Sequence, residues 1–206
     1  MIDKSIEYRD IVMVMDGKTV MATAAPQLPE GFNFRLFEGE NDISHWCRIE
    51  ASVQEFDSEN DAKKHFAHEF HPHLDEMKKR CIFITNKEGL PIATATCWFS
   101  DGEITSRLHW VAVCPGYQGL GLGKAVSQLA VNVSASIYPN QPMWLSTQTW
   151  SHRAVLMYHK LGFNIVKSDM KLGEKNAYVQ DYPKAMEVLA GVLAPGDMET
   201  LSSIAI

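Results

Sequence analysis

The sequence lacks long apolar runs, closely spaced cysteines and an excess of basic residues. No stretch approaches the ~18–20 consecutive apolar residues that a membrane-spanning helix requires, and the charged N-terminus is unlike a secretory signal. The four cysteines are widely spaced, without a C-x-x-C pair, which predicts reduced thiols in the core. With 19 Lys and Arg against 25 Asp and Glu, the net charge is -6, unlike that of a general nucleic-acid binder. These absences predict a cytoplasmic protein that binds neither nucleic acid nor a membrane.

The chain has enough apolar residues for one sizeable core. Of its 206 residues, 46% are hydrophobic and 21% are charged, proportions that allow burial to offset the entropy lost on folding. Domains commonly contain ~100–200 residues, so the length predicts one main domain with additions. We expect the main domain at residues 31–185, with additions at residues 1–30 and 186–206.

Local patterns predict both strands and helices. Asp16-Gly17 tolerates the positive φ angles of a two-residue turn and predicts a β-hairpin over residues 6–24. The strands joined by short turns between residues 81 and 114 predict an antiparallel meander. The tail from residue 186 is expected to be irregular or to form a closing helix. Further strands are expected at 32–36, 143–150 and 163–166, and helices from Asn41 or Asp42, from Ser58 to about 71, at 123–137 and from Ser151 to Gly162.

The most informative segment runs from Val111 to Lys124, where a strand, a turn, a glycine loop and a helix start follow one another. Alternating glycines let a ligand approach the backbone, and the first N–H groups of a helix attract an anion such as a diphosphate. The dinucleotide fingerprint needs Gly or Ala where Lys124 stands, and the P-loop needs Gly where Gln118 stands, so neither fits. A tight connection without a ligand is the alternative.

Two motifs remain, and both have a known counterpart. One is Gln118-Gly119-Leu120-Gly121-Leu122-Gly123 after a strand, and the other is Ala154-x-x-x-Tyr158-x-x-x-Gly162-Phe163. With the order of elements from 81 to 166, they resemble the GNAT superfamily of acyl-coenzyme A-dependent N-acetyltransferases. The resemblance implies an α/β (α+β) fold with a mixed, mostly antiparallel central sheet flanked by helices, to which the N-terminal hairpin would be added. It also implies transfer of an acetyl group from acetyl-coenzyme A to a primary amine by direct attack, on a small molecule or peptide, without a metal.

The resemblance also implies which residues hold the cofactor. The loop would bind the diphosphate of coenzyme A, and the preceding strand would pair with its pantetheine arm. Ser151 stands where many relatives have an Asn that helps to hold the cofactor. The implied cofactor-binding residues are Val111, Ala112, Val113, Gln118, Gly119, Leu120, Gly121, Leu122, Gly123, Lys124, Ser151 and Tyr158.

Acetylation needs a base, because an alkylamine is protonated at neutral pH. The two-residue period of a strand predicts one face shared by Arg107, His109, Val111 and Val113. His109 is the first candidate for a base or proton relay, since a histidine ordinarily titrates near pH 6.5, and it matches a histidine of the arylalkylamine N-acetyltransferases. Glu103 is the second candidate.

The remaining roles follow from the same resemblance. Tyr158 falls on the family's general-acid position, where a phenol can protonate the departing thiolate. Arg107 stands where many relatives have the acidic base, so a non-catalytic acyl-coenzyme A-binding or sensing module is the alternative function. The predicted hairpin would cover the acceptor cleft or form the interface of a homodimer, and the sequence does not choose between them.

Other chemically active side chains have simpler interpretations. Cys114 could serve as a nucleophile, but nothing nearby in the sequence would activate it, so we interpret it as core filler. The histidines at 65–73 are metal-ligand types without the spacing of a zincin, and we expect them to be solvated. The acidic residues at 55–59 lie where the resemblance places the acceptor, although a solvated face is the expected interpretation.

Overall fold

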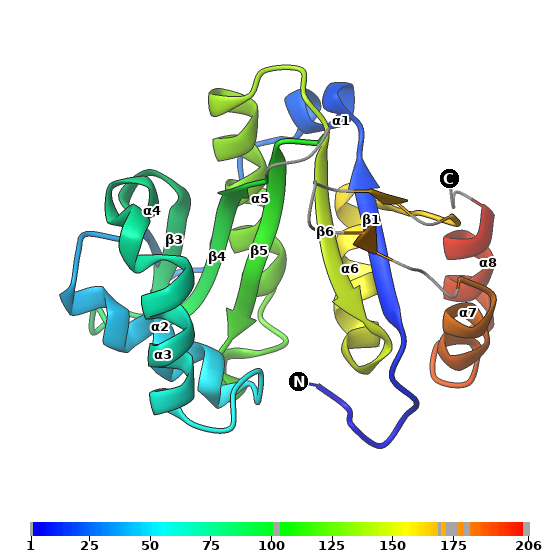
Figure 1. Ribbon diagram of the computed structural model, residues 1–206, viewed down its shortest axis with the longest axis horizontal. Helices are drawn as coiled ribbons and strands as arrows, with labels where there is room; N and C mark the ends of the chain where they lie inside the picture. Colours follow the sequence, from blue (N-terminus) through cyan, green and yellow to red (C-terminus); the bar gives the residue numbers. More distant parts are fainter. Residues whose placement is uncertain (1, 101–103, 169, 172–176, 179–181, 204–206) are drawn as a thin grey trace. The chain divides into compact units, whose positions relative to one another are not determined.

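The computed structural model of the protein describes residues 2–100, 104–168, 170–171, 177–178 and 182–203 (Figure 1). Contacts between residues divide the chain into two compact units. The first comprises residues 24–98 and 108–133, and the second comprises residues 2–23, 99–107 and 134–206. None of the described helices is long and apolar enough to cross a membrane.

The expected mixed, mostly antiparallel sheet is confirmed. The described strands are linked by hydrogen bonds in the order β2 (Asn33–Leu36), β3 (Cys81–Thr85), β4 (Pro91–Phe99), β5 (Ser106–Val113), β6 (Met143–Gln148), β1 (Asp10–Met15) and β7 (Asn164–Ile165). β3 pairs antiparallel with β2 and β4, and β1 pairs antiparallel with β6 and β7. β5 and β6 run parallel, where Ser106 and Arg107 face Met143 and Trp144. These last four residues all belong to the second unit.

Helices cover the strands of the first unit on both sides. In Figure 1, α2 (Asn41–Ser52) and α3 (Glu59–Glu69) lie in front of β3 and β4, and α5 (Leu122–Ile137) lies behind. The buried ring of Trp46 on α2 packs edge-on against Phe66 and the neighbouring Phe70. After α3 the chain forms η1 (His71–His73) and α4 (Leu74–Arg80), a helix that the sequence analysis did not predict. All four cysteines are buried and none forms a disulfide, as expected.

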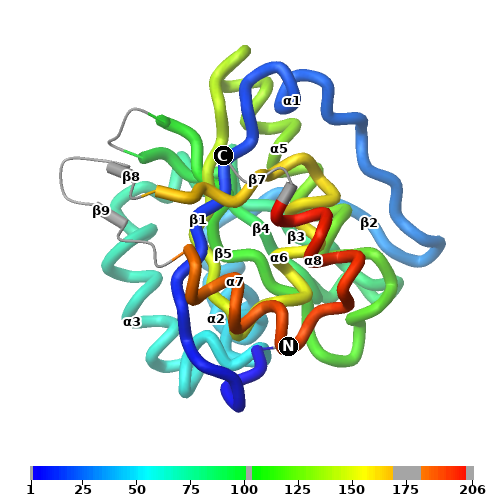
Figure 2. The backbone as a smooth tube through the Cα atoms, turned by 90° about the vertical axis from the view of Figure 1, so that its right-hand side faces the viewer, coloured from blue at the N-terminus to red at the C-terminus, as the bar shows by residue number. Residues whose placement is uncertain are grey.

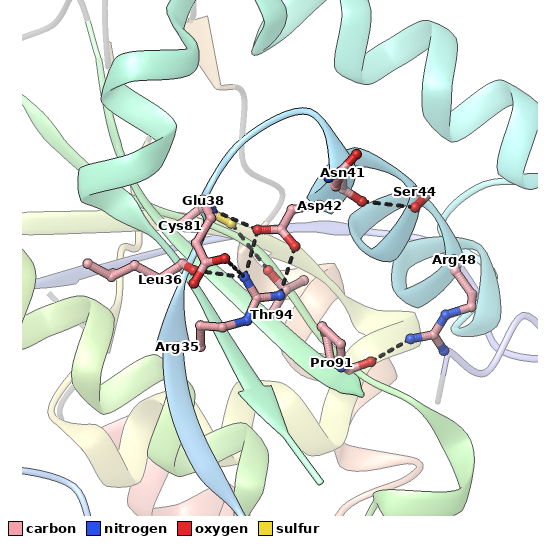
Figure 3. A network of polar contacts seen from close by, with 10 residues as sticks. All are labelled: Arg35, Leu36, Glu38, Asn41, Asp42, Ser44, Arg48, Cys81, Pro91 and Thr94. Carbon is pink, nitrogen blue, oxygen red and sulfur yellow. Dashed lines mark hydrogen bonds and ion pairs between the residues drawn. The ribbon is translucent and has the colours of Figure 1, made fainter. Parts of the chain in front are cut away.

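An ion pair fixes the start of α2 to β2 (Figure 3). The sequence predicted Asn41 or Asp42 as the helix cap, but the Asp42 carboxylate instead binds Arg35. The two Nη atoms of Arg35 donate to the two carboxylate oxygens at 2.8 and 2.7 Å, and the Glu38 N–H donates at 2.7 Å. Burial raises the pKa of Asp42, but the hydrogen bonds from Arg35 and Glu38 outweigh this effect and hold the pKa below its ordinary value.

The second unit contains β1, β6 and β7 together with helices that contact these strands. α6 (His152–Leu161) contacts β6 and β7, while α7 (Tyr182–Ala190) contacts β1. α6 ends at Gly162, which has the left-handed φ of 110° that favours glycine at a helix C-terminus. The tail forms α7 and α8 (Pro195–Ser203), which lie side by side (Figure 2), so a closing helix is present. A short antiparallel pair, β8 (Met170–Lys171) and β9 (Ala177–Tyr178), precedes α7.

The expected N-terminal hairpin is wrong. Its first strand exists as β1, but residues 17–22 form the helix α1 (Gly17–Ala22). The Asp16 carboxylate accepts hydrogen bonds from the N–H groups of Lys18 and Thr19 at 2.9 and 3.1 Å, so it caps the helix. A Cβ at Gly17 would lie 2.1 Å from the carbonyl oxygen of Asn140. Asp16-Gly17 is therefore a helix cap followed by a close backbone approach, and β1 finds its partners in β6 and β7.

Candidate active site

The glycine loop joins β5 to α5 in the first unit. Gly119 and Gly121 have φ angles of +82° and +79°, and a Cβ at either would meet no described heavy atom within 4 Å. The first helical bond joins the Ala125 N–H to the Gly121 carbonyl at 3.0 Å. The N–H groups of residues 122–124 therefore have no carbonyl partner within the helix. An open loop at the start of a helix has the geometry and the partial positive charge that fit a diphosphate.

The loop is anchored to the end of β5. Gln118 Nε2 donates a hydrogen bond to the Val113 carbonyl at 2.9 Å, and Asn86 Nδ2 donates to Tyr117 Oη at 3.0 Å. These bonds tie Gln118 to the end of β5, and Tyr117, the last residue of η2 (Pro115–Tyr117), to the residue that follows β3. Leu120, at the tip of the loop, is 49% exposed. Gln118 thus contributes its side chain to the shape of the loop.

We infer a β-bulge in β5 at Trp110 from the backbone angle and the side-chain contacts. This residue has a φ of +50°. His109 Nε2 and Trp110 Nε1 both lie within hydrogen-bonding distance of the Glu69 carboxylate, at 2.8 and 3.1 Å. Neighbouring side chains of a regular strand point to opposite faces, so the shared partner of His109 and Trp110 departs from that alternation, as a β-bulge would make it do.

Cys114 follows β5 directly and lies beyond the bulge. Its Sγ contacts Arg48 and Ser52 of α2, at 3.8 and 3.6 Å. Cys114 therefore lies against α2, while His109 meets Glu69 at the end of α3. The face that His109 was expected to share with Val111 and Val113 stays a prediction.

Glu69, the last residue of α3, is the centre of a polar cluster. Its Oε1 lies 2.8 Å from His109 Nε2, and its Oε2 lies 2.6 Å from His65 Nε2 and 3.1 Å from Trp110 Nε1. Burial raises the pKa of Glu69, but the hydrogen bonds from His109 and His65 outweigh burial and hold the pKa well below its ordinary value. The side chains of Glu69 and His109 are 23% and 10% exposed. Glu69 is therefore a half-buried carboxylate that accepts several hydrogen bonds.

Aromatic rings enclose this cluster. Phe56 stacks on Trp110 with 5.1 Å between ring centroids, and His65 meets the Trp110 ring edge-on at 4.9 Å. The histidine-rich stretch thus has a structural role at His65, where the sequence predicted solvation. Among the described residues, no group of three or more His, Cys, Asp or Glu side chains is placed to hold a metal ion.

The other predicted site residues belong to the second unit. Tyr158 on α6 is buried, and its ring meets Phe163 edge-on at 6.1 Å. Ser151 occupies the N-cap position of α6 without a side-chain hydrogen bond to the helix. Arg107 lies over the Trp144 ring at 4.5 Å and donates to Ser146 Oγ at 2.9 Å. Glu103, the second candidate base, lies outside the described residues.

Sequence analysis missed Glu69 and Trp110 as partners of His109. The spacing of His65 and Glu69, four residues apart on one helix, indicated that these two side chains could meet. Their contact with β5 joins residues 40 positions apart along the chain. Only tertiary structure reveals such a pairing.

Comparison with known proteins agrees with this arrangement. Residues 43–163 match the sequence model of the acetyltransferase (GNAT) family. Mycothiol acetyltransferases of Streptomyces scabiei and Streptomyces griseus are 26% and 24% identical to the chain over 180 and 187 residues. Each alignment covers 79% of this chain and 53% of the relative. The chain thus spans about half the length of the curated relatives it matches.

A solved structure shows the same fold. The GCN5-related N-acetyltransferase of Sphaerobacter thermophilus aligns with a TM-score of 0.60 and 18% identity, over 76% of this chain and 48% of that one. The family match spans more than half of the 206 residues and includes both the glycine loop and the helix that carries Tyr158. The chain therefore belongs to the acetyltransferase (GNAT) family.

Proposed function

We propose that this protein is an N-acetyltransferase that moves an acetyl group from acetyl-coenzyme A to a primary amine by direct attack. The observation that carries the proposal is the glycine loop, with its left-handed glycines and open surface, within a chain of the acetyltransferase family. Bound acetyl-coenzyme A would supply the acetyl group as a thioester. Residues 118–124 would hold its diphosphate through the amides of the loop and of the first turn of α5.

His109 is the proposed base. An alkylamine with a pKa of about 10.4 is protonated at pH 7, so exposing its lone pair costs about 4–5 kcal/mol unless a base assists. A histidine can take that proton near neutral pH, directly or through a water molecule. Its contact with the Glu69 carboxylate supports this role, because a neighbouring anion stabilises a protonated ring. Glu103 stays the second candidate.

Tyr158 is the proposed acid, on the strength of the family signature in which it stands. When the new C–N bond forms and the C–S bond breaks, the phenol would give its proton to the departing thiolate. Ser151 and the backbone of residues 111–113 are proposed to complete the cofactor site. These assignments follow from the resemblance, residue by residue.

The acceptor is proposed at the level of chemical class. A primary amine on a small molecule or peptide suits direct attack on a thioester. A mycothiol-related amine is the first compound to test, because the relatives are named mycothiol acetyltransferases. A cytoplasmic location, a catalytic domain at residues 31–185 and a homodimer belong to the same proposal.

Two measurements on the purified chain test the function. Calorimetric titration with acetyl-coenzyme A should show binding, and a panel of amines should release free thiol from it. Absence of heat and of a thermal shift would refute the cofactor assignment. Binding without thiol release across the panel would identify a non-catalytic acyl-coenzyme A-binding module instead.

A further inference from the structure

The His109 ring is held by a carboxylate that the family signatures do not include. Glu69 comes from the end of α3, and His109 comes from β5, and their Oε1 and Nε2 atoms lie 2.8 Å apart. Both side chains are largely shielded from solvent, with 23% and 10% of their surfaces exposed. The contact is therefore much less weakened by water than a surface ion pair would be.

The ionised state of Glu69 determines the direction of this hydrogen bond. Burial raises the pKa of Glu69, but the hydrogen bonds that it accepts lower the pKa more, so the group is a carboxylate at neutral pH. A carboxylate only accepts hydrogen bonds, and His109 Nε2 must therefore carry the proton. In the neutral ring the lone pair then lies on Nδ1, which becomes the basic nitrogen.

The other contacts fix the carboxylate itself. Its Oε2 lies 2.6 Å from His65 Nε2 and 3.1 Å from Trp110 Nε1. Trp110 reaches it because the bulge turns two consecutive side chains of β5 toward α3. His109 also packs against the rings of Phe70 and Trp110. Among the described residues, the titratable side chains that contact Glu69 are His65 and His109.

We propose that Glu69 is a positioning residue for acetyl transfer. Its carboxylate accepts a hydrogen bond from the Nε2–H group of His109, so that Nδ1 of the ring is the proton acceptor. As the amine attacks, one N–H bond of its positively charged nitrogen breaks and an Nδ1–H bond forms on His109. The resulting imidazolium faces the Glu69 carboxylate. The step transfers one proton and needs no other reactant. This inference rests on the proposed function and adds a residue to its machinery.

The test compares Glu69→Gln with Glu88→Gln, which makes the same chemical change at an exposed position in the turn between β3 and β4. Thiol release is measured from pH 5 to 9 with a responsive amine. Glu69→Gln should lower kcat by about 10- to 100-fold at the plateau and move the acidic limb of the profile about one unit to lower pH, because the imidazolium loses its anion. Glu88→Gln should match the wild type. An acidic limb that stays in place in Glu69→Gln would overturn the proposal.

A spectroscopic readout separates this inference from the proposed function. If the wild type turns over no amine, the ¹⁵N spectrum of its histidines still reports which nitrogen of His109 carries the proton. A neutral ring protonated at Nε2, with a titration midpoint that falls in Glu69→Gln, supports the proposal. A ring protonated at Nδ1 overturns it. Should Glu69→Gln fail to fold, the wild-type spectrum alone decides in the same way.

Discussion

Two glycines with the same backbone conformation allow a controlled test of the loop. Gly121 lies in the proposed diphosphate site with a φ of +79°, and Gly89 lies in the turn between β3 and β4 with a φ of +80°. At both positions a Cβ would meet no described heavy atom within 4 Å. An alanine therefore adds only the strain of the left-handed conformation, about 1 kcal/mol. Each variant should melt about 2–4 °C lower than the wild type.

Cofactor affinity should separate the two variants. The methyl group of Gly121→Ala would project into the open side of the loop, where the diphosphate is proposed to lie. A hydrogen bond to a charged group contributes about 1.5–3 kcal/mol. Loss of one such bond weakens acetyl-coenzyme A binding about 10- to 150-fold. Gly89→Ala should bind with the wild-type dissociation constant.

Isothermal titration with acetyl-coenzyme A and thermal melting of the free protein measure both quantities. The melting temperature shows whether the strain is equal in the two variants, and the titration isolates the effect on the ligand. If Gly121→Ala binds acetyl-coenzyme A as tightly as Gly89→Ala does, the loop does not hold the diphosphate. The proposed function would then lose the observation that carries it.

Three further changes test the buried polar groups and the proposed acid. Asp42→Asn should lower the free energy of unfolding, measured by urea denaturation, by about 1–3 kcal/mol at pH 7. Because the pKa of Asp42 is lowered in the folded state, the difference from the wild type should shrink below about pH 4. A difference that does not change with pH would contradict the ion pair. Glu50 is fully buried, and neither carboxyl oxygen has a hydrogen-bond partner among the described residues. Burial raises the pKa of Glu50 well above the ordinary value, so Glu50→Met should stabilise the fold by about 1–3 kcal/mol. The gain should grow as pH rises above about 4.3, where the unfolded chain loses the Glu50 proton. A variant less stable than the wild type at pH 7 would refute the prediction. Tyr158→Phe should slow thiol release about 10²- to 10⁴-fold with acetyl-coenzyme A affinity within about twofold, and an unchanged rate would remove Tyr158 from the mechanism.

Local sequence signals were sufficient for much of the fold. Ser58 caps α3 through the Asp61 N–H, and Gly162 ends α6, as each residue's chemistry predicts. The turn beside Gly89 and the glycines before α5 marked the ends of their strands equally well. Such features depend on residues within four positions of one another, so the sequence pattern alone predicts them.

The errors occurred where one local pattern allows two structures. Asp16-Gly17 suits a hairpin turn and also suits a helix cap, and the choice depends on β1 pairing with β6, more than 120 residues away in sequence. In the same way, the Asp42 carboxylate could cap a helix but forms an ion pair with Arg35 instead. Partners more than four positions away decide between such alternatives, because the two local conformations alone differ little in free energy.

The sequence by itself determined the family, the glycine loop and the identity of the residues proposed to bind and react. Only the tertiary structure decided which residues the side chains of β5 contact. Around Trp110, whose φ is +50°, the side chains of both His109 and Trp110 contact one carboxylate, that of Glu69. No periodicity in the sequence predicts this shared contact, because Glu69 and His109 are 40 positions apart along the chain. The partner of His109 therefore became visible only when α3 and β5 were placed together.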